Sequence, residues 1–140
     1  MRSAPTLTLQ TARAVLTSAI SHAEASGLKM SVAVVDGGGN LICFEHMDGA
    51  PLISTEISQA KAFTALAFKS NTESLAKYAE PGGACFGMET SVARPLAFWG
   101  GGAPLLTEDE VVGAVGAGGA SPDQDAEVAQ TAVGEFQRIS

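Results

Sequence analysis

The sequence predicts an α+β fold, in which an antiparallel sheet built from hairpins is covered by helices. Two observations lead to this prediction. Segments with apolar residues at helical spacing alternate with short β-branched runs that flank glycine-rich turns. The order along the chain is helix, hairpin, helices, hairpin, helix, and hairpins give antiparallel strand pairs.

The first predicted element is a helix over residues 8–26. Its apolar side chains recur at helical spacing on one face: Leu9, Ala12, Leu16, Ala19, Ile20 and Ala23. Thr8 can cap the start of this helix, because its hydroxyl can accept from a free backbone amide. Gly27 can close the end, because glycine readily adopts the left-handed conformation found there.

A hairpin is predicted next. Residues 30–35 are a β-branched run typical of a buried strand, and residues 36–40, Asp-Gly-Gly-Gly-Asn, are typical of a turn. Residues 41–46 return as the partner strand. Regular alternation along this strand puts Ile42, Phe44 and His46 on one face.

A loop and helices are expected in the middle of the chain. Residues 47–51 form the loop, and a helix runs from Ser54 to about Lys69 with Ser54 or Thr55 as its cap. A shorter helix is expected near residues 72–79.

A second hairpin and a last helix complete the predicted fold. Residues 100–104 are expected to be a tight turn, and residues 111–117 a strand of small side chains. Ser121, Pro122 and Gln124 together are typical of a helix start, and the helix extends to about residue 139.

Length and composition fit a single domain over residues 1–140. Charged residues make up 16%, against about 25% in typical domains. We therefore expect weakly polar surface to be buried between subunits of a homo-oligomer. The net charge is −7 and the sequence has no basic patch, so neither nucleic acid nor an anionic membrane surface is an expected partner.

A cytoplasmic location is expected, because Met1–Gln10 lacks the pattern of a secretory signal and no run approaches the roughly 20 apolar residues of a membrane span. The two cysteines, Cys43 and Cys85, form no C-x-x-C pair. With no histidine or carboxylate cluster at ligand spacing either, no metal site is predicted.

Glycine clusters at residues 37–39, 100–102 and 116–119 could cradle an anion. None has the pattern of a Walker loop or a dinucleotide fingerprint. The simpler interpretation is tight turns together with a strand that a ligand or another subunit approaches closely.

Lys61 is the first candidate catalytic residue. It shares a helix face with Ile57, Thr64 and Phe68, an apolar setting in which a lysine can act as an anion anchor, a base or a Schiff-base nucleophile. The alternative is a lysine that packs its stem and directs its ammonium to water or to a carboxylate.

His22 and His46 are the candidate haem ligands, and His46 is also a candidate general acid or base. Asp36 and Asp48 are candidate proton partners, although turn formation is the simpler role for both. No C-x-x-C-H motif is present, so any haem is expected to bind non-covalently.

Residues 84–98 give an ambiguous secondary-structure signal. Phe86 lies within this segment, and Trp99, the single tryptophan, directly precedes three glycines. With Thr64, Gly101 and Gly102, they are the candidate ligand-binding residues near Lys61.

Several blocks, in order along nearly the whole chain, resemble the GlcG/HbpS family, also called the haem-degrading domain family (DUF336). The blocks are MSVAVVDGGGNL (30–41), MDGAPL (47–52), QAKA (59–62), GGAPL (101–105), VVGAVG (111–116) and SPDQD (121–125). The chain departs from the family pattern at Gly118, where a serine is common, and over residues 80–99. The second of these regions is expected to shape the ligand pocket.

The resemblance implies a profilin-like layer architecture and a homo-oligomer. Some family members bind haem, including secreted haem sensors and a domain appended to cobalamin adenosyltransferases, whereas others sit among catabolic genes. Three functions remain open: a cofactor-independent enzyme acting on a small oxygenated metabolite, a non-covalent haem or tetrapyrrole binder, and a structural accessory subunit.

Overall fold

The computed structural model describes residues 4–140, so Met1–Ser3, the start of the segment Met1–Gln10, lie outside the described residues. Four strands form one antiparallel sheet in the order β2-β1-β4-β3. The strands are β1 (Ser31–Asp36), β2 (Leu41–His46), β3 (Gly102–Thr107) and β4 (Glu110–Gly118). Both predicted hairpins are present, and pairing of β1 with β4 joins them, which confirms the α+β prediction.

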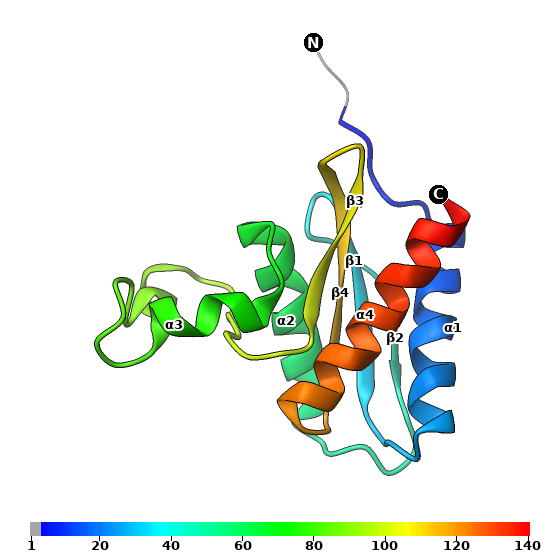
Figure 1. The fold of residues 1–140 in the computed structure, drawn as a ribbon, viewed down its shortest axis with the longest axis horizontal. Helices are drawn as coiled ribbons and strands as arrows, with labels where there is room; N and C mark the ends of the chain where they lie inside the picture. Colours follow the sequence, from blue (N-terminus) through cyan, green and yellow to red (C-terminus); the bar gives the residue numbers. More distant parts are fainter. Residues whose placement is uncertain (1–3) are drawn as a thin grey trace.

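Helices cover both faces of the sheet (Figure 1). Helices α1 (Leu9–Ala25) and α4 (Pro122–Ile139) pack together on one face, and α2 (Ser54–Phe68) lies on the other. The strand β1 is buried on both sides. Val32 and Val34 belong to the core beneath α1 and α4, whereas Ala33 and Val35 face α2.

The outer helices begin as their sequences predict. Thr8 accepts a hydrogen bond from the Thr11 amide at the start of α1, and Gly27 follows the helix end with a φ of +71°. At the start of α4, Ser121 and Gln124 form a reciprocal capping box.

The expected cap of α2 is wrong. The helix begins at Ser54, but neither the Ser54 nor the Thr55 side chain caps it. The Ser54 hydroxyl instead donates to the Pro51 carbonyl, and the Thr55 hydroxyl contacts His46. Both side chains are used by a polar network described below, which competes with capping.

The expected alternation along β2 is also wrong at its start. Val34 pairs with Cys43 while Val35 pairs with Leu41, so Ile42 is an extra residue in a β-bulge. Ile42 therefore packs with Cys43 against the α1 and α4 side, whereas Phe44 faces α2.

The late hairpin starts earlier than expected. β3 begins at Gly102, within the segment 100–104 that was predicted to be a turn, and the turn itself is at Glu108 and Asp109. Both turn residues have positive φ, 50° and 67°, as in a two-residue type I′ turn.

Glycine lets α2 lie directly on the sheet. A side chain at Gly116 of β4 would overlap the Ser58 carbonyl, and one at Gly102 would overlap the Lys61 carbonyl. The close neighbour of this small-residue strand is therefore a helix of the same chain.

Residues 73–96, called the arm below, project beyond α2 away from the sheet (Figure 1). The chain enters the arm through η1 (Thr72–Leu75) and α3 (Ala76–Ala79), which confirms a short helix near residues 72–79; one later turn, η2 (Met88–Ser91), lies within it. No residue of the arm is buried. Among residues 4–140, no helix is long and apolar enough to cross a membrane.

Candidate functional site

The candidate residues from the sequence fall into two main groups in the structure. Lys61, Thr64, Trp99, Gly101 and Gly102 gather where α2 meets β3 and the start of α4. His46 ends β2 and Asp48 lies in the loop that follows it, beside a hollow on the surface.

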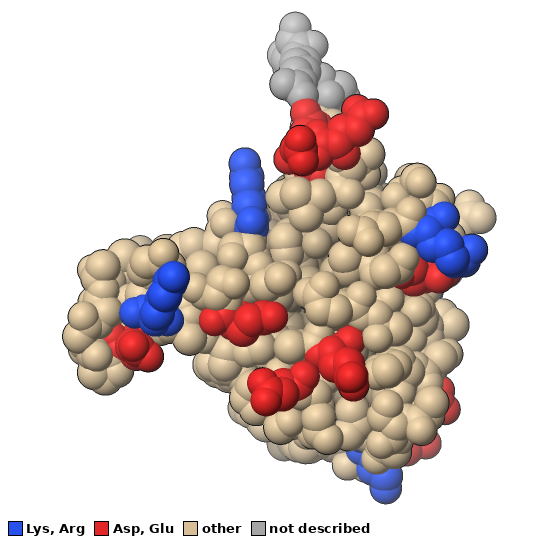
Figure 2. All heavy atoms as spheres, in the orientation of Figure 1, with Lys and Arg blue, Asp and Glu red and all other residues tan. Residues whose placement is uncertain are grey.

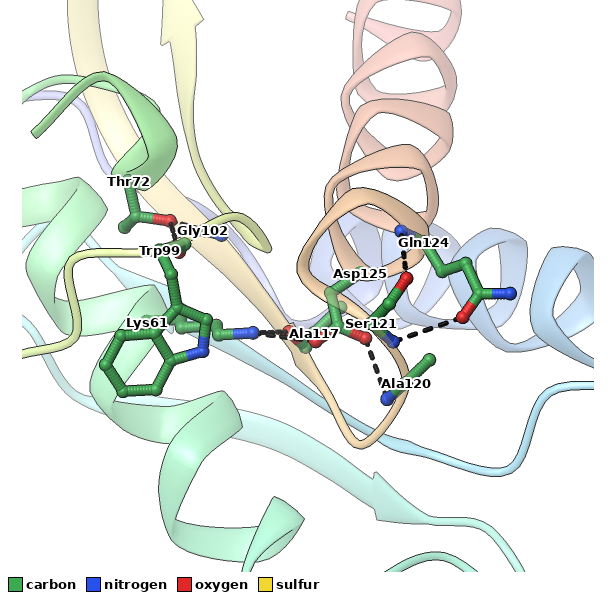
Figure 3. Close-up of polar contacts among 9 residues, drawn as sticks. All are labelled: Lys61, Thr72, Trp99, Gly102, Ala117, Ala120, Ser121, Gln124 and Asp125. Atoms are coloured by element: carbon green, nitrogen blue, oxygen red, sulfur yellow. Dashed lines mark hydrogen bonds and ion pairs between the residues drawn. The ribbon is translucent and has the colours of Figure 1, made fainter. Parts of the chain in front are cut away.

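Lys61 is fully buried and points from α2 toward the start of α4 (Figure 3). Its ammonium donates to an Asp125 carboxylate oxygen at 2.8 Å and to the Ala117 carbonyl at 3.0 Å. The Trp99 ring centroid lies 5.8 Å from the same nitrogen. Burial lowers the pKa of Lys61, while the hydrogen bond and charge of Asp125 oppose that shift.

Asp125 was missed by sequence reasoning. Its second oxygen accepts from the Ala120 amide, so the carboxylate ties the start of α4 to the turn after β4 and to α2. An acid in the first turn of a helix is normally explained by its interaction with the helix dipole. The sequence therefore gave no reason to expect Asp125 to be the ion-pair partner of a distant lysine. The one available signal was Lys61 itself, a lone cation on a helix face that needs a partner.

The neighbours of Lys61 are held by backbone contacts. The Thr64 hydroxyl donates to the Ala60 carbonyl and accepts from the Ala97 amide. The Thr72 hydroxyl donates to the Trp99 carbonyl and accepts from the Gly102 amide. The Lys61 side chain fills the space next to Gly101, where an added Cβ would lie only 2.7 Å from the Lys61 ammonium nitrogen.

Three candidates lie outside both groups. Asp36 stays in the hairpin turn, where its carboxylate accepts from the amides of Gly38 and Asn40. Nε2 of His22 on α1 lies 3.3 Å from a Glu127 oxygen on α4. Phe86 is 64% exposed in the arm.

His46, the last residue of β2, is held through one ring nitrogen. Its Nδ1 lies 2.8 Å from the Ser31 hydroxyl and 3.1 Å from the Thr55 hydroxyl. The Ser31 hydroxyl in turn lies 2.8 Å from that of Ser54, and both serines are fully buried. Among the contacts of the described residues, Nε2 has no hydrogen-bond partner.

These hydroxyls were also missed as site residues. Ser54 and Thr55 were interpreted as helix caps, and Ser31 as an ordinary strand residue. The spacing offered a weak signal, because antiparallel pairing places Ser31 opposite His46.

His46 lines a surface hollow of about 600 Å³. The hollow lies between the end of α1 and the end of β2. Its lining also contains apolar side chains, three acids and one cation: Ile20, Leu28, Met47, Glu24, Glu45, Asp48 and Lys29.

A second, more apolar hollow of about 380 Å³ lies between α2 and the arm. Phe63, Phe68, Met88 and Val92 line it, together with Arg94, whose guanidinium stacks on the Phe63 ring at 3.8 Å. Within residues 4–140, no group of three His, Cys, Asp or Glu side chains is placed to hold a metal ion.

The chain is similar to known proteins along most of its length. A family model described as "Haem degrading protein HbpS-like" matches residues 7–134. An uncharacterized 15.0 kDa protein from the dhaT–dhaS intergenic region of Citrobacter freundii is 33% identical over 120 residues, which cover 83% of this chain and 84% of that protein.

Solved structures show the same fold. The Klebsiella pneumoniae protein ORFY matches with a TM-score of 0.96 and 29% identity, covering 100% of this chain and 97% of ORFY. A PduOC:heme complex matches with a TM-score of 0.88 and 30% identity, covering 93% of this chain and 94% of PduOC.

Proposed function

This chain belongs to the HbpS-like family of haem-degrading proteins, and on that premise we propose that it binds haem or a related tetrapyrrole non-covalently through Nε2 of His46. The relative PduOC has been solved as a complex with haem, which supports the ligand class.

The observation that carries the proposal is the way His46 is held. A histidine that binds a metal usually uses one ring nitrogen for the metal and the other for a hydrogen bond that orients the ring. His46 has this arrangement, with Nδ1 bonded to the buried Ser31 hydroxyl and to the Thr55 hydroxyl, and with Nε2 without a protein partner among the described residues. His22 differs, because its Nε2 already contacts Glu127.

The hollow beside His46 fits the group in size and in part of its chemistry. Its volume of about 600 Å³ lies within the range of about 300–1,000 Å³ that is usual for small-ligand and cofactor sites. Ile20, Leu28 and Met47 offer apolar contact, and the Lys29 ammonium suits a propionate carboxylate. When bound, haem supplies the redox and ligand-binding chemistry of its iron.

A haemin titration followed by visible absorbance tests the proposal. We expect the wild type to shift the Soret band with a saturable 1:1 endpoint. His46→Ala should bind much more weakly and with a different band position, whereas the matched variant His22→Ala should behave like the wild type. Unchanged binding by His46→Ala would contradict the assignment of the ligand.

A second candidate function uses the same atom. A free Nε2 in an open hollow shared with Asp48 also suits a general base acting on a small oxygenated metabolite. This enzyme hypothesis is favoured if haemin leaves the spectrum unchanged while small hydroxy or oxo acids perturb the His46 ring signals in NMR spectra. Lys61, which is buried against Asp125, has no part in either proposal.

A further inference from the structure

We propose that Ser31 and Ser54 are positioning residues that hold His46 in the tautomer with its proton on Nδ1, so that the Nε2 lone pair is available to a ligand. The role assigned to this lone pair rests on the proposed function. The tautomer itself follows from the hydrogen-bond chain and can be measured in the protein without haem.

The direction of each hydrogen bond from His46 through Ser31 and Ser54 to Pro51 follows from counting protons. The Pro51 carbonyl can only accept, so at 2.6 Å it receives the single hydroxyl proton of Ser54. The Ser54 oxygen must then accept the proton of Ser31 at 2.8 Å. With its own proton committed, the Ser31 oxygen can only accept from His46, so Nδ1 carries the proton.

Thr55 is compatible with the same direction, because a hydroxyl can accept as well as donate. Its hydroxyl lies 3.1 Å from Nδ1 and can share the Nδ1 proton as a second acceptor. The two contacts reach the ring from β1 and from α2, which fixes its orientation as well as its tautomer.

Reversing the direction of these hydrogen bonds costs one of them. For Nε2 to carry the proton, Ser31 would donate to Nδ1 and Ser54 would donate to Ser31, and the 2.6 Å bond to Pro51 would be lost. The Pro51 carbonyl would then keep only its bond from the Ser54 amide at 2.9 Å, so the reversed arrangement has one hydrogen bond fewer within the protein.

This arrangement predicts that a change two hydrogen bonds away reverses the tautomer. In Ser54→Ala the acceptor of the Ser31 proton is gone, so Ser31 donates to Nδ1 instead and the proton moves to Nε2. The lone pair that would bind iron is then blocked, although no atom of His46 has changed. Ser58→Ala is the matched control, because Ser58 is an equally buried serine of α2 whose hydroxyl donates to the Thr55 carbonyl.

The test is a long-range ¹H–¹⁵N correlation spectrum of the haem-free protein at a pH at which the ring is neutral. His22→Ala identifies the signals of His46. We expect the Nδ1-protonated pattern in the wild type and in Ser58→Ala, and the Nε2-protonated pattern in Ser54→Ala. An Nε2-protonated wild type overturns the inference, and that measurement needs no variant to fold.

Haemin titration of the same proteins separates the two proposals. Loss of such an outer partner typically weakens metal binding by roughly 10–100-fold, so we expect a weakening of that order in Ser54→Ala and none in Ser58→Ala. A wild type with the expected tautomer but no haem binding would contradict the proposed function alone. Haem binding by a wild type with the opposite tautomer, or an unchanged tautomer in Ser54→Ala, would overturn the inference alone.

Discussion

Removing the Lys61 ammonium leaves the Asp125 carboxylate buried with only the Ala120 amide to satisfy it. Breaking a buried ion pair from one side typically costs about 3–5 kcal/mol, because the remaining charge is uncompensated. We expect Lys61→Met to lose that much free energy of unfolding in urea denaturation. Lys77→Met, at an exposed position of the arm, should change it by less than about 0.5 kcal/mol.

The double variant Lys61→Met/Asp125→Leu provides the check on this explanation. It removes both charges, so it should be more stable than Lys61→Met alone. A single variant as stable as the wild type would show that the pair does not hold α2 to α4.

Asp36 gives a residue-scale prediction about pH. Burial alone would raise the pKa of Asp36, but hydrogen bonds from Asn40 and Gly38 outweigh it and lower the pKa below 3.8. A carboxyl whose pKa is lower in the folded state stabilises the fold above the unfolded pKa, and that contribution is lost as the pH falls through the folded value.

Asp36→Asn should therefore be less stable than the wild type at neutral pH, by about 1 kcal/mol. The difference should shrink as the pH is lowered through and below 3.8 in a series of urea titrations. A difference that stays constant with pH would show that the carboxylate charge is not involved.

Single residues could be singled out from the sequence, but not their partners. Lys61 stands out because it is the only cation on its helix face, and one of the two interpretations, an ammonium that meets a carboxylate, matches its geometry. Asp125 is distant in sequence and gave no separate signal. The network of Ser31, Ser54 and His46 depends on the register of β1 with β2 and on the start of α2, which no local pattern specifies.

At the scale of elements, the contact between α2 and β4 depends on the missing side chain at Gly116. A Cβ at this position would overlap the Ser58 carbonyl, so the helix would have to move away from the sheet. We expect Gly116→Ala to lower the free energy of unfolding by about 1–3 kcal/mol, the usual cost of overpacking a core.

Gly134→Ala is the matched control for Gly116→Ala. Gly134 lies inside α4, and a Cβ there meets no atom within 4 Å. Because alanine is the better helix former, we expect this change to stabilise the protein by about 0.5–1 kcal/mol. Equal effects of the two substitutions would contradict the close packing of α2 on the sheet.

The predicted elements were mostly right because each has a local signal. Hydrophobic periodicity located α1, the Ser121, Pro122 and Gln124 signal located the start of α4, and the Asp-Gly-Gly-Gly-Asn turn located the first hairpin. The errors arose where tertiary contacts override local preference. Ser54 gives up capping for the bond to Pro51, and the bulge at Ile42 appears only when β2 pairs with β1.

At the scale of the whole molecule, the arm is the part of the structure that packs least against the rest of a single chain. None of its residues is buried, and it exposes Tyr78, Phe86 and Val92 by 43%, 64% and 48%. Large parts of the face seen in Figure 2 carry no charged side chain. An ordered, partly apolar segment without a core of its own needs a surface to pack on.

We therefore propose that the arm packs on a second copy of the chain. Light scattering at micromolar concentration should give a multiple of the mass of one chain. Phe86→Glu combined with Val92→Glu should lower that mass, whereas circular dichroism should remain that of the wild type, because neither side chain is buried. A wild type with the mass of one chain would contradict this proposal.

The fold could be predicted from the sequence more completely than the site. Hairpins and amphipathic helices leave few ways to build a layered α+β domain, so local signals were sufficient. The candidate catalytic residues do not share one cavity, because Lys61 and Gly101 fill interior space between α2 and the sheet, while His46 and Asp48 line a hollow elsewhere. Which side chains share a cavity depends on packing between elements, and the spacing of residues along the chain does not specify that packing.

The central claim is that Nε2 of His46 can bind the iron of haem. Resonance Raman spectra of the reduced haem complex report the bond between iron and a histidine ligand directly. We predict an iron–histidine stretching band in the wild type and in His22→Ala, and its loss in His46→Ala. The same band in His46→Ala, or its loss in His22→Ala, would contradict the account.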